Sequence, residues 1–444
     1  MKISKILLGS ALLLTSGVFA QMKKVDFVQY DLPNGLHVIL HKDNSTPVVA
    51  VTMLYHVGSK NEQPDRTGMA HFFEHLLFEG SENIKRGEFD KYIENAGGIL
   101  NANTSIDRTF YHEVLPSNQL ELGLWLESER LMHAKVEKVG IETQREVVKE
   151  ERRQRIDNQP YGTLLEQTYK HAYNVHPYKW PTIGSMDHLN AATDQEFVDF
   201  YKTFYVPNNA TLCIAGDIDV EQTKALIGKY FSEIPKGVKP VPRPGKELTE
   251  PKQTAEVRDI VYDNVQLPLI IQAYHIPAQG TPDYYAVEML GTLISGGESS
   301  RFYKKIVDEK QQALQAGLFN LGSEDPGLSL AYCITNAGVK PEEAEATMNA
   351  ELDRVKTELI SDGELQKLKN QMESQFVQQA SSAVGIAETL ANYHTYFGDA
   401  NLINTEIDRY LKVTKEDIQR VAKTYFTKEN RVVLYYLPKE KSAK

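Results

Sequence analysis

The stretch TGMAHFFEHLLFEG constrains this chain most, because it carries His71, Glu74 and His75 in the pattern H-x-x-E-H. Apolar residues fill the gaps, Thr67 can cap the start of a helix and Gly80 can end it, so the stretch predicts a short helix. Positions four apart share one helix face, which aims both imidazoles at one point with Glu74 at its edge. Such a set suits a catalytic zinc and its water. The alternative is two helical histidines packed in a core.

A wider pattern surrounds this motif. The motif inverts H-E-x-x-H, and it is followed by LLFEGS, by a Gly-Gly-x-x-Asn-Ala-x-Thr stretch and, about seventy-five residues on, by a charged helix. This order resembles the pitrilysin/insulinase family of zinc metallopeptidases (inverzincins), specifically half-length members such as the mitochondrial processing peptidase subunits. The resemblance covers nearly the whole mature chain. It implies an α+β fold with two similar lobes that face each other across a cavity.

Residues 1–20 have the features of an export signal. They carry two lysines near the start, an apolar run too short to span a bilayer and a small-residue cleavage site ending at Ala20. We therefore predict a signal peptide over 1–20 and a periplasmic or secreted protein. The mature chain would start at Gln21, which cannot carry the lipid of a cysteine at that place, and no later run suits a stable membrane anchor. Removing two lysines and no acid changes the formal charge from −11 to −13, which disfavours nucleic acid as a partner.

The chain shows a join and an internal repeat. Prolines cluster in 236–251, which predicts an extended linker between an N-terminal metal-binding lobe over 21–235 and a C-terminal lobe without a metal site over 252–444. Segments 193–212 and 414–433 line up without a gap. Each begins with a threonine and an acid three residues later, then reaches an aromatic pair, an asparagine and an apolar strand. The repeat indicates a duplicated α+β unit.

Strand and helix patterns define the first lobe. Asn-Gly between two alternating runs is a strong hairpin signal, and a hairpin disfavours an all-parallel sheet. Each lobe is therefore expected to hold a mostly antiparallel sheet with helices packed on one face. Cys213 and Cys333 lie in apolar strands of different lobes, so both are predicted to be buried free thiols. The expected strands are 27–32, 36–42, 48–57 and 99–111, and the expected helices include 118–132 and 141–155.

A catalytic zinc usually has three protein ligands, and the third must come from outside the motif. Helix 141–155 offers Glu142, Glu146, Glu150 and Glu151, and spacing alone does not choose among them. The family resemblance implies Glu151, through the pattern E-R-x-V-x-x-x-E.

Two further residues bear on this prediction. Gln144 stands where the family pattern has its first glutamate, a group expected to support the ligands without touching the metal. His56, on a strand fifteen residues before the motif, is a rival third ligand, although such a histidine is more often hydrogen-bonded. We expect one zinc ion per chain.

The resemblance also assigns roles in the reaction. Glu74 would take a proton from the metal-bound water and pass it to the leaving amine. Asn101, Ala102, Asn103 and Thr104 would form an edge strand that pairs with an extended peptide through main-chain hydrogen bonds. The alternative for these four residues is an ordinary interior strand with polar side chains on one face.

The second lobe raises the question of a partner. Active relatives place an arginine and a tyrosine just beyond the segment that matches 296–303, whereas Val307–Gln315 holds neither. We therefore predict a zinc endopeptidase that cuts peptides or unfolded polypeptides in the cell envelope with a homologous second subunit, as a heterodimer, with a homodimer possible. The alternative function is a non-catalytic binding or assembly subunit of a peptidase-like complex.

Overall fold

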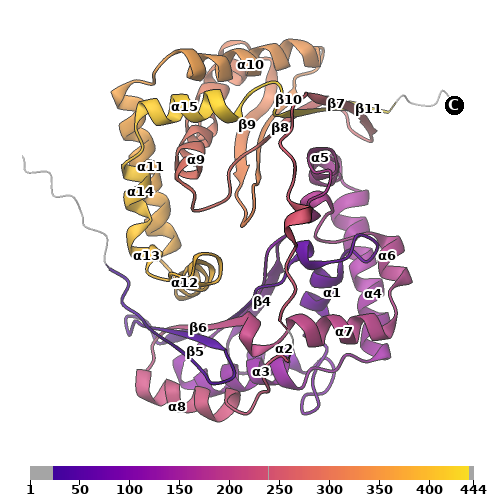
Figure 1. Cartoon of the computed structure of the whole chain (residues 1–444), viewed down its shortest axis with the longest axis vertical. Coiled ribbons are helices and arrows are strands. Elements are labelled where there is room, and N and C mark those ends of the chain that lie inside the picture. The colour runs from indigo at the N-terminus through magenta and orange to yellow at the C-terminus, as the bar shows by residue number, and fades with distance from the viewer. Residues whose placement is uncertain (1–23, 239, 440–444) are drawn as a thin grey trace, which may run out of the picture.

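The computed structural model describes residues 24–238 and 240–439, so the predicted signal peptide lies outside the described residues. Two lobes stand one above the other (Figure 1), each with one sheet and its own helices. Within the described residues, no helix is both long and apolar enough to cross a membrane. The first half contains β1 (Val28–Asp31), β2 (His37–Lys42), β3 (Val48–Tyr55), α1 (Met69–Leu76), α2 (Phe89–Asn95), β4 (Ile99–Thr104), β5 (Thr109–Pro116), α3 (Leu120–Met132), α4 (Lys138–Arg152), α5 (Leu164–Ala172), α6 (Met186–Ala191), α7 (Asp194–Phe204), β6 (Ala210–Gly216) and α8 (Val220–Phe231).

The second half follows a similar order. One helix, α9, lies between its strands β8 and β9, and the helices α10 to α15 follow the hairpin β9–β10. It contains β7 (Val257–Asp263), β8 (Leu269–His275), α9 (Pro282–Ser295), β9 (Ala313–Leu321), β10 (Leu328–Thr335), α10 (Pro341–Thr357), α11 (Asp362–Gln379), α12 (Ala383–Phe397), α13 (Leu402–Thr405), α14 (Ile407–Leu411), α15 (Lys415–Tyr425) and β11 (Arg431–Pro438).

Both sheets are mixed and mostly antiparallel. The first has the strand order β1-β2-β6-β3-β5-β4, with β2 and β6 parallel, and the second has the order β7-β11-β8-β10-β9, with β7 and β11 parallel. The edge strands β4 and β9 hold the same place in the two orders. The α+β fold with two similar lobes is therefore confirmed.

Each sheet is covered on its second face by a helix from the other half. The helices of the first half pack on one face of their sheet, while α12 packs on the opposite face, against Ile39, Leu54 and Cys213. In return, α5 lies against the second sheet beside Ile271 and Leu434 (Figure 1). This exchange explains the continuous apolar run of β6, which is buried on both faces. Both cysteines are free and buried, as predicted.

The predicted strand over 99–111 is wrong, because the chain turns inside it. Strand β4 ends at Thr104 and β5 begins at Thr109, and the two pair as an antiparallel hairpin. The Ser105 hydroxyl accepts hydrogen bonds from the backbone N–H groups of Asp107 and Arg108, both at 3.1 Å. These hydrogen bonds stabilise a turn, whereas the apolar and β-branched neighbours favour a continuous strand, so the sequence pattern did not predict the turn.

The internal repeat extends to single hydrogen bonds. The Asn209 side-chain amide donates to the carbonyl oxygens of Phe204, at 2.8 Å, and of His56, at 3.3 Å. The Asn430 amide donates to the carbonyl oxygens of Tyr425, at 2.7 Å, and of His275, at 2.9 Å. In each half, an asparagine thus ties the end of a capped helix to the end of a strand.

A group of four residues joins the halves, and we call it the clasp: His56, Lys60, Asp107 and Glu324. Lys60 is buried, 2.8 Å from the Asp107 carboxylate, and also pairs with Glu324 on the turn between β9 and β10. His56 Nε2 lies 2.8 Å from Glu324 Oε2. Burial alone would raise the pKa of Glu324, but His56 and Lys60 lower it to about 2, so this carboxylate is charged.

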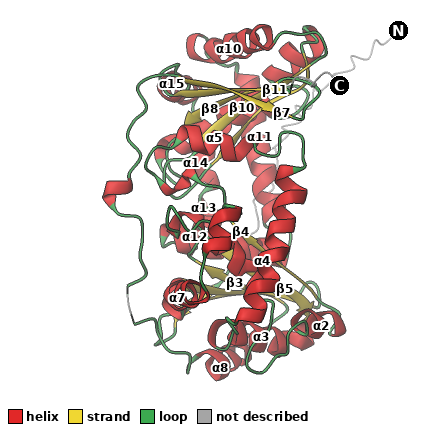
Figure 2. Ribbon diagram, turned by 90° about the vertical axis from the view of Figure 1, so that its right-hand side faces the viewer, coloured by secondary structure: helices red, strands yellow, loops and turns green. Residues whose placement is uncertain are grey.

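The connection between the lobes runs along one side of the molecule (Figure 2). Between α8 and β7 it contains a single short helical turn, Lys246–Leu248, among the residues that the structure describes. The Glu250 carboxylate accepts hydrogen bonds from the backbone N–H groups of Asn174, Val175 and His176, at 2.9 to 3.0 Å. This connection is therefore attached to the first half. The lobe limits given above remain a prediction.

Candidate active site

Helix α1 presents the motif residues from a buried position. The predicted cap is wrong: Gly68, with φ of +94°, precedes the helix, and the Thr67 hydroxyl instead lies 2.8 Å from His188 Nδ1. The buried Glu62 carboxylate caps the helix, because it accepts hydrogen bonds from the N–H groups of Gly68 and Ala70, both at 2.8 Å. Burial raises the pKa of Glu62 to about 8, although the hydrogen bonds from these N–H groups oppose the rise. The helix ends at Leu76, before the Gly80 expected to stop it.

The structure brings His71, His75 and Glu151 together. His75 Nε2 lies 3.0 Å from Glu151 Oε2, and His71 Nε2 lies 3.5 Å from the same oxygen. In a tetrahedral zinc site with bonds of about 2.1 Å, neighbouring ligand atoms are about 3.4 Å apart. In the described part of the chain, these three residues are the one group of histidines, cysteines and acids whose ligand atoms all lie within 4.8 Å of one another.

The protonation states of the three residues also suit a metal. Glu151 Oε2 is buried and accepts no hydrogen bond from the described residues, although His75 is close to it. The His75 imidazole lowers the pKa of Glu151, and burial lowers the pKa of His71 to about 4. Near neutral pH the carboxylate is therefore charged and the His71 imidazole neutral, which are the forms that bind zinc. The residues fit the ion.

Glu74 connects this group to the edge strand. Its Oε2 accepts a hydrogen bond of 2.5 Å from the Thr104 hydroxyl at the end of β4. Burial raises the pKa of Glu74, as a general base near neutral pH requires. Glu74 is absent from the group of three, so its carboxylate is left for proton transfer beside the ligands.

The predicted substrate strand is the last strand of its sheet. Asn101 accepts a hydrogen bond from the N–H of Ala102, at 2.8 Å, and Asn103 Oδ1 accepts one of 2.7 Å from Arg108. One side of β4 pairs with β5, and the other side has no strand partner in the described residues. The arrangement therefore matches an edge and not an interior strand, while peptide binding there stays a prediction.

Two other residues named from the sequence have hydrogen-bond partners outside the ligand group. The Gln144 amide donates to the carboxylate of Glu79, which also pairs with Arg86. A glutamine can donate to a carboxylate there, whereas an ionised glutamate could not. His56 belongs to the clasp and not to the metal group.

Two residues of this site were not predicted from the sequence. Arg155 Nη1 lies 2.6 Å from Glu151 Oε1, which leaves Oε2 for the shared point with the histidines. The i,i+4 spacing between these two residues could have indicated it. Glu62, the cap of α1, has no such local signal, because its partners depend on how the preceding loop folds back.

Comparisons with known proteins agree with this geometry. The family described as "Insulinase (Peptidase family M16)" matches residues 37–186, and "Peptidase M16 inactive domain" matches residues 191–372. "Zinc protease PqqE" of Helicobacter pylori is 33% identical over 97% of this chain and 98% of its own length. This chain belongs to the M16 peptidase family.

Further M16 proteins agree in fold and sequence. The crystal structure of a protease from Helicobacter pylori has a TM-score of 0.89 and 31% identity, over 93% of this chain and all of that one. "Probable mitochondrial-processing peptidase subunit beta" of Arabidopsis thaliana is 24% identical over 89% of this chain and 75% of its own length. With the ligand geometry above, these findings identify the chain as a zinc metalloprotease, with His71, His75 and Glu151 as its candidate zinc site.

Proposed function

We propose that this M16 protein is an endopeptidase that cuts extended peptides and unfolded polypeptides laid along β4. The observation that carries the proposal is the hydrogen bond between Thr104, on the free edge, and Glu74, beside the metal ligands. It places the proton-transfer group at the end of a strand that can hold a backbone. One zinc ion per chain is expected, because the described residues form one such ligand group.

The side chains have distinct tasks in this proposal. Bound zinc supplies an acidified water and polarises the carbonyl of the scissile bond. His71, His75 and Glu151 hold the ion, and Arg155 keeps the second Glu151 oxygen turned away. Glu74 takes the proton of the attacking water and delivers it to the leaving nitrogen, while Thr104 fixes the orientation of its carboxylate.

The β4 edge favours one class of substrate. Main-chain N–H and C=O groups pair with a backbone whatever its side chains are, so recognition needs an extended segment. Folded proteins seldom offer such a segment, because their backbone groups are already paired. The export signal predicted over 1–20 supports a location of this activity in the cell envelope or outside the cell.

A homologous second subunit is part of the proposal. Val307–Gln315 offers neither arginine nor tyrosine, and Arg301, just before it, is bound to Glu364 at 3.1 Å. A donor to the developing oxyanion would then come from another chain. Loss of one such donor typically costs roughly a hundred- to a thousandfold in rate. The isolated subunit should therefore be a poor peptidase that a partner activates.

The main test uses the Glu74→Gln variant and a quenched unstructured peptide. We expect kcat/KM to fall about 10²- to 10⁴-fold, because the general base is lost, while the protein still holds one zinc ion by mass spectrometry. His71→Ala should lose both metal and activity. Glu74→Gln cleaving at the wild-type rate would contradict the assigned role.

The partner needs a separate test. Light scattering and activity are measured on the purified chain alone and after addition of a homologous chain that lacks H-x-x-E-H. A large gain in kcat with formation of a mixed dimer supports the partner. Full activity from a monodisperse monomer would disprove it and leave the metal-site assignment unaffected.

A further inference from the structure

A cavity lies beyond the end of β4, between the two halves. Its volume is about 430 Å³, within the range of ligand pockets. The turn Ser105–Arg108 forms one wall, and α9, α11, α12 and α14 form the others. None of His71, His75, Glu74 and Glu151 lines it, so it is distinct from the candidate zinc site.

Two carboxylates line this cavity. Among the described residues, neither Glu288 nor Glu406 forms an ion pair at 4.0 Å or less, and Glu288 Oε1 is a buried atom that accepts no hydrogen bond. Glu406 accepts hydrogen bonds from the hydroxyls of Tyr285, at 3.1 Å, and of Tyr393. The Arg409 guanidinium, which donates to the Tyr285 hydroxyl at 2.7 Å, is close enough to lower the pKa of Glu406, so Glu288 is the carboxylate with no cation beside it. Unpaired buried carboxylates are costly, so such an arrangement favours a ligand that brings positive charge.

Two charged residues of the wall are already engaged with other residues. Asp107 pairs with Lys60 at 2.8 Å, and the Arg108 guanidinium bonds Asn103 and Glu388. By contrast, Asn392 Oδ1 is a second buried acceptor that receives no hydrogen bond from the described residues. The wall thus holds two buried acceptor atoms, Glu288 Oε1 and Asn392 Oδ1, that lack a donor among the described residues.

The titration of these acids agrees with this environment. Burial raises the pKa of Glu288 to about 7, and burial also raises the pKa of Glu406. A cation held between them would favour the charged forms of both carboxylates.

Aromatic side chains complete the wall. Tyr284, Tyr393 and Tyr410 are buried and line the cavity together with Tyr396. Aromatic faces attract ammonium and guanidinium groups, by about 0.5–2 kcal/mol per contact depending on desolvation. A buried carboxylate oxygen and an amide oxygen that lack donors, set among aromatic rings, are the features of a site for an organic cation.

We infer that this cavity binds an alkylammonium or guanidinium group, with Glu288 as its principal counter-charge. The cation can come from a basic side chain of a peptide on β4 or from a free polyamine. The wall Ser105–Arg108 directly follows the predicted substrate strand, and an extended chain advances about 3.3 Å per residue. The geometry therefore favours a basic residue a few positions from the scissile bond, and that source rests on the proposed function.

Binding is tested without catalysis. The zinc-loaded chain is titrated calorimetrically with acetyl-Ala-Lys-Ala-amide, its norleucine analogue and spermidine. We expect the lysine peptide to bind at least tenfold more weakly to Glu288→Gln than to wild type, and the norleucine analogue to give no heat. Glu416→Gln, which removes an exposed acid on α15, is the matched charge control and should bind like wild type. Asn392→Ser provides a second variant of the same wall.

The sources of the cation are then separated with quenched peptides in which one lysine is moved along a neutral sequence. Wild type should prefer one lysine position at least fivefold in kcat/KM, and Glu288→Gln should lose this preference while cleaving the neutral peptide normally. Binding of spermidine with no such preference would assign the site to a free polyamine and overturn its role in substrate choice.

The two proposals fail in different ways. Equal binding of all three probes by wild type and Glu288→Gln overturns the cation site, whether or not peptides are cleaved. A zinc-loaded chain that cleaves no peptide, even with its partner, overturns the endopeptidase proposal, and the titration still decides the cavity.

Discussion

The two lobes share a scaffold but not its chemistry. Tyr55 ends β3 and His56 follows it, and Tyr274-His275 ends β8. Each histidine reaches into the opposite half: His56 Nε2 to Glu324, at 2.8 Å, and His275 Nε2 to the carbonyl oxygen of Ala172, at 2.9 Å. These two histidine contacts help to hold the two halves together.

The difference lies in the helix between the central strand and the edge hairpin. In the first half this is α1, with two histidines and Glu74 beside Glu151. In the second half it is α9, which has no histidine but carries Glu288 on the wall of the acidic cavity. The same architecture thus holds a candidate metal site in one half and a cavity wall with Glu288 in the other, because function depends on the side chains and not on the fold.

The largest effect is expected where the halves differ most. Glu151→Gln removes the charged ligand that faces both histidines. Loss of a residue that only hydrogen-bonds to a metal ligand typically lowers metal affinity by about 10- to 100-fold, so the loss of zinc affinity in this variant should be larger. Metal content after dialysis and kcat/KM should fall together. Glu150→Gln, at an exposed position that pairs with Arg153, is the control. Full zinc occupancy in Glu151→Gln would exclude Glu151 as a ligand.

The next test compares the shared scaffold. Asn209→Ala and Asn430→Ala each leave two backbone carbonyl oxygens without their donor, and each should lower the free energy of unfolding by about 1–3 kcal/mol. The Asn209 variant should lose more, because Arg243 also donates to Asn209 Oδ1, at 2.7 Å. Urea denaturation gives both values. If one of the two variants has the same free energy of unfolding as wild type, the repeated hydrogen bonds contribute to stability in the other half alone.

Local patterns predicted much of the fold and of the candidate site. The spacing of His71 and His75 and the Asn34-Gly35 turn act over a few residues, so the sequence displays them directly. Choosing Glu151 among four acids required the family pattern, because helical spacing treats all of them alike.

Features that depend on distant contacts could not be predicted. The exchange of α5 and α12 gives two helices whose apolar faces match sheets of the other half, and nothing local reveals the partner. The Ser105 turn was hidden for a different reason, since its hydrogen bonds compete with a strand that the flanking residues favour. Glu62 caps a helix six residues away through a loop of irregular shape.

A smaller effect is expected at the clasp. Glu324→Gln removes the charge that neutralises Lys60, but Asp107 remains at 2.8 Å, so the loss of stability should be about 1–2 kcal/mol. Because the pKa of Glu324 is lowered to about 2, its contribution is complete above the unfolded value of 4.5 and is lost as the pH falls towards 2. Wild type and variant should therefore converge in acid. A constant difference between pH 6 and pH 2.5 would contradict this account.

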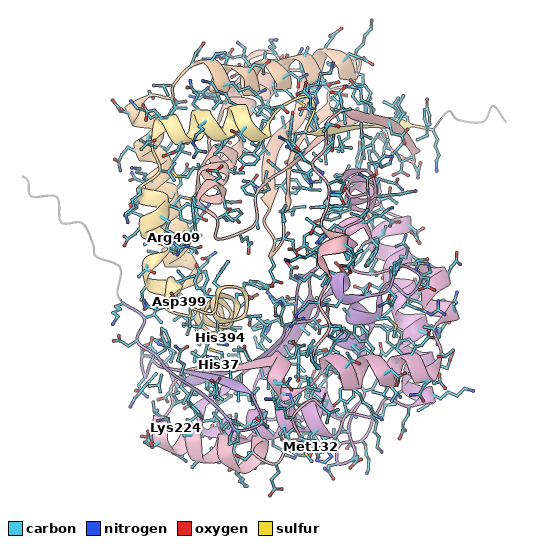
Figure 3. All side chains as sticks on the ribbon, viewed as in Figure 1. His37, Met132, Lys224, His394, Asp399 and Arg409 are labelled. Atoms are coloured by element: carbon cyan, nitrogen blue, oxygen red, sulfur yellow. The ribbon has the colours of Figure 1, made fainter. Side chains whose placement is uncertain are left out.

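The smallest effect is expected where α12 meets the first sheet. The rings of His37, on β2, and His394, on α12, stack with centroids 3.3 Å apart, and Figure 3 shows them meeting between the lobes. The His37 Nδ1 atom lies 2.7 Å from the Asp31 carboxylate. Burial, and then the neighbouring His37, lower the pKa of His394 to about 4. Acid should therefore weaken this contact between the halves.

The direction of the pH effect follows from linkage. The pKa of His394 is lower in the folded chain than the unfolded value of 6.5, so stability is unaffected above pH 6.5 and falls as the pH drops towards 4. The full shift corresponds to about 3 kcal/mol, and partial exposure of the ring reduces this to about 1 kcal/mol. His394→Phe keeps a stacked ring without a proton to bind, so its unfolding free energy should depend less on pH in this window. His133→Phe, at the end of α3, serves as the control. If His394→Phe and wild type lose stability in parallel from pH 6.5 to 4, acid must act elsewhere, and the contact of α12 with the first sheet is then insensitive to charge.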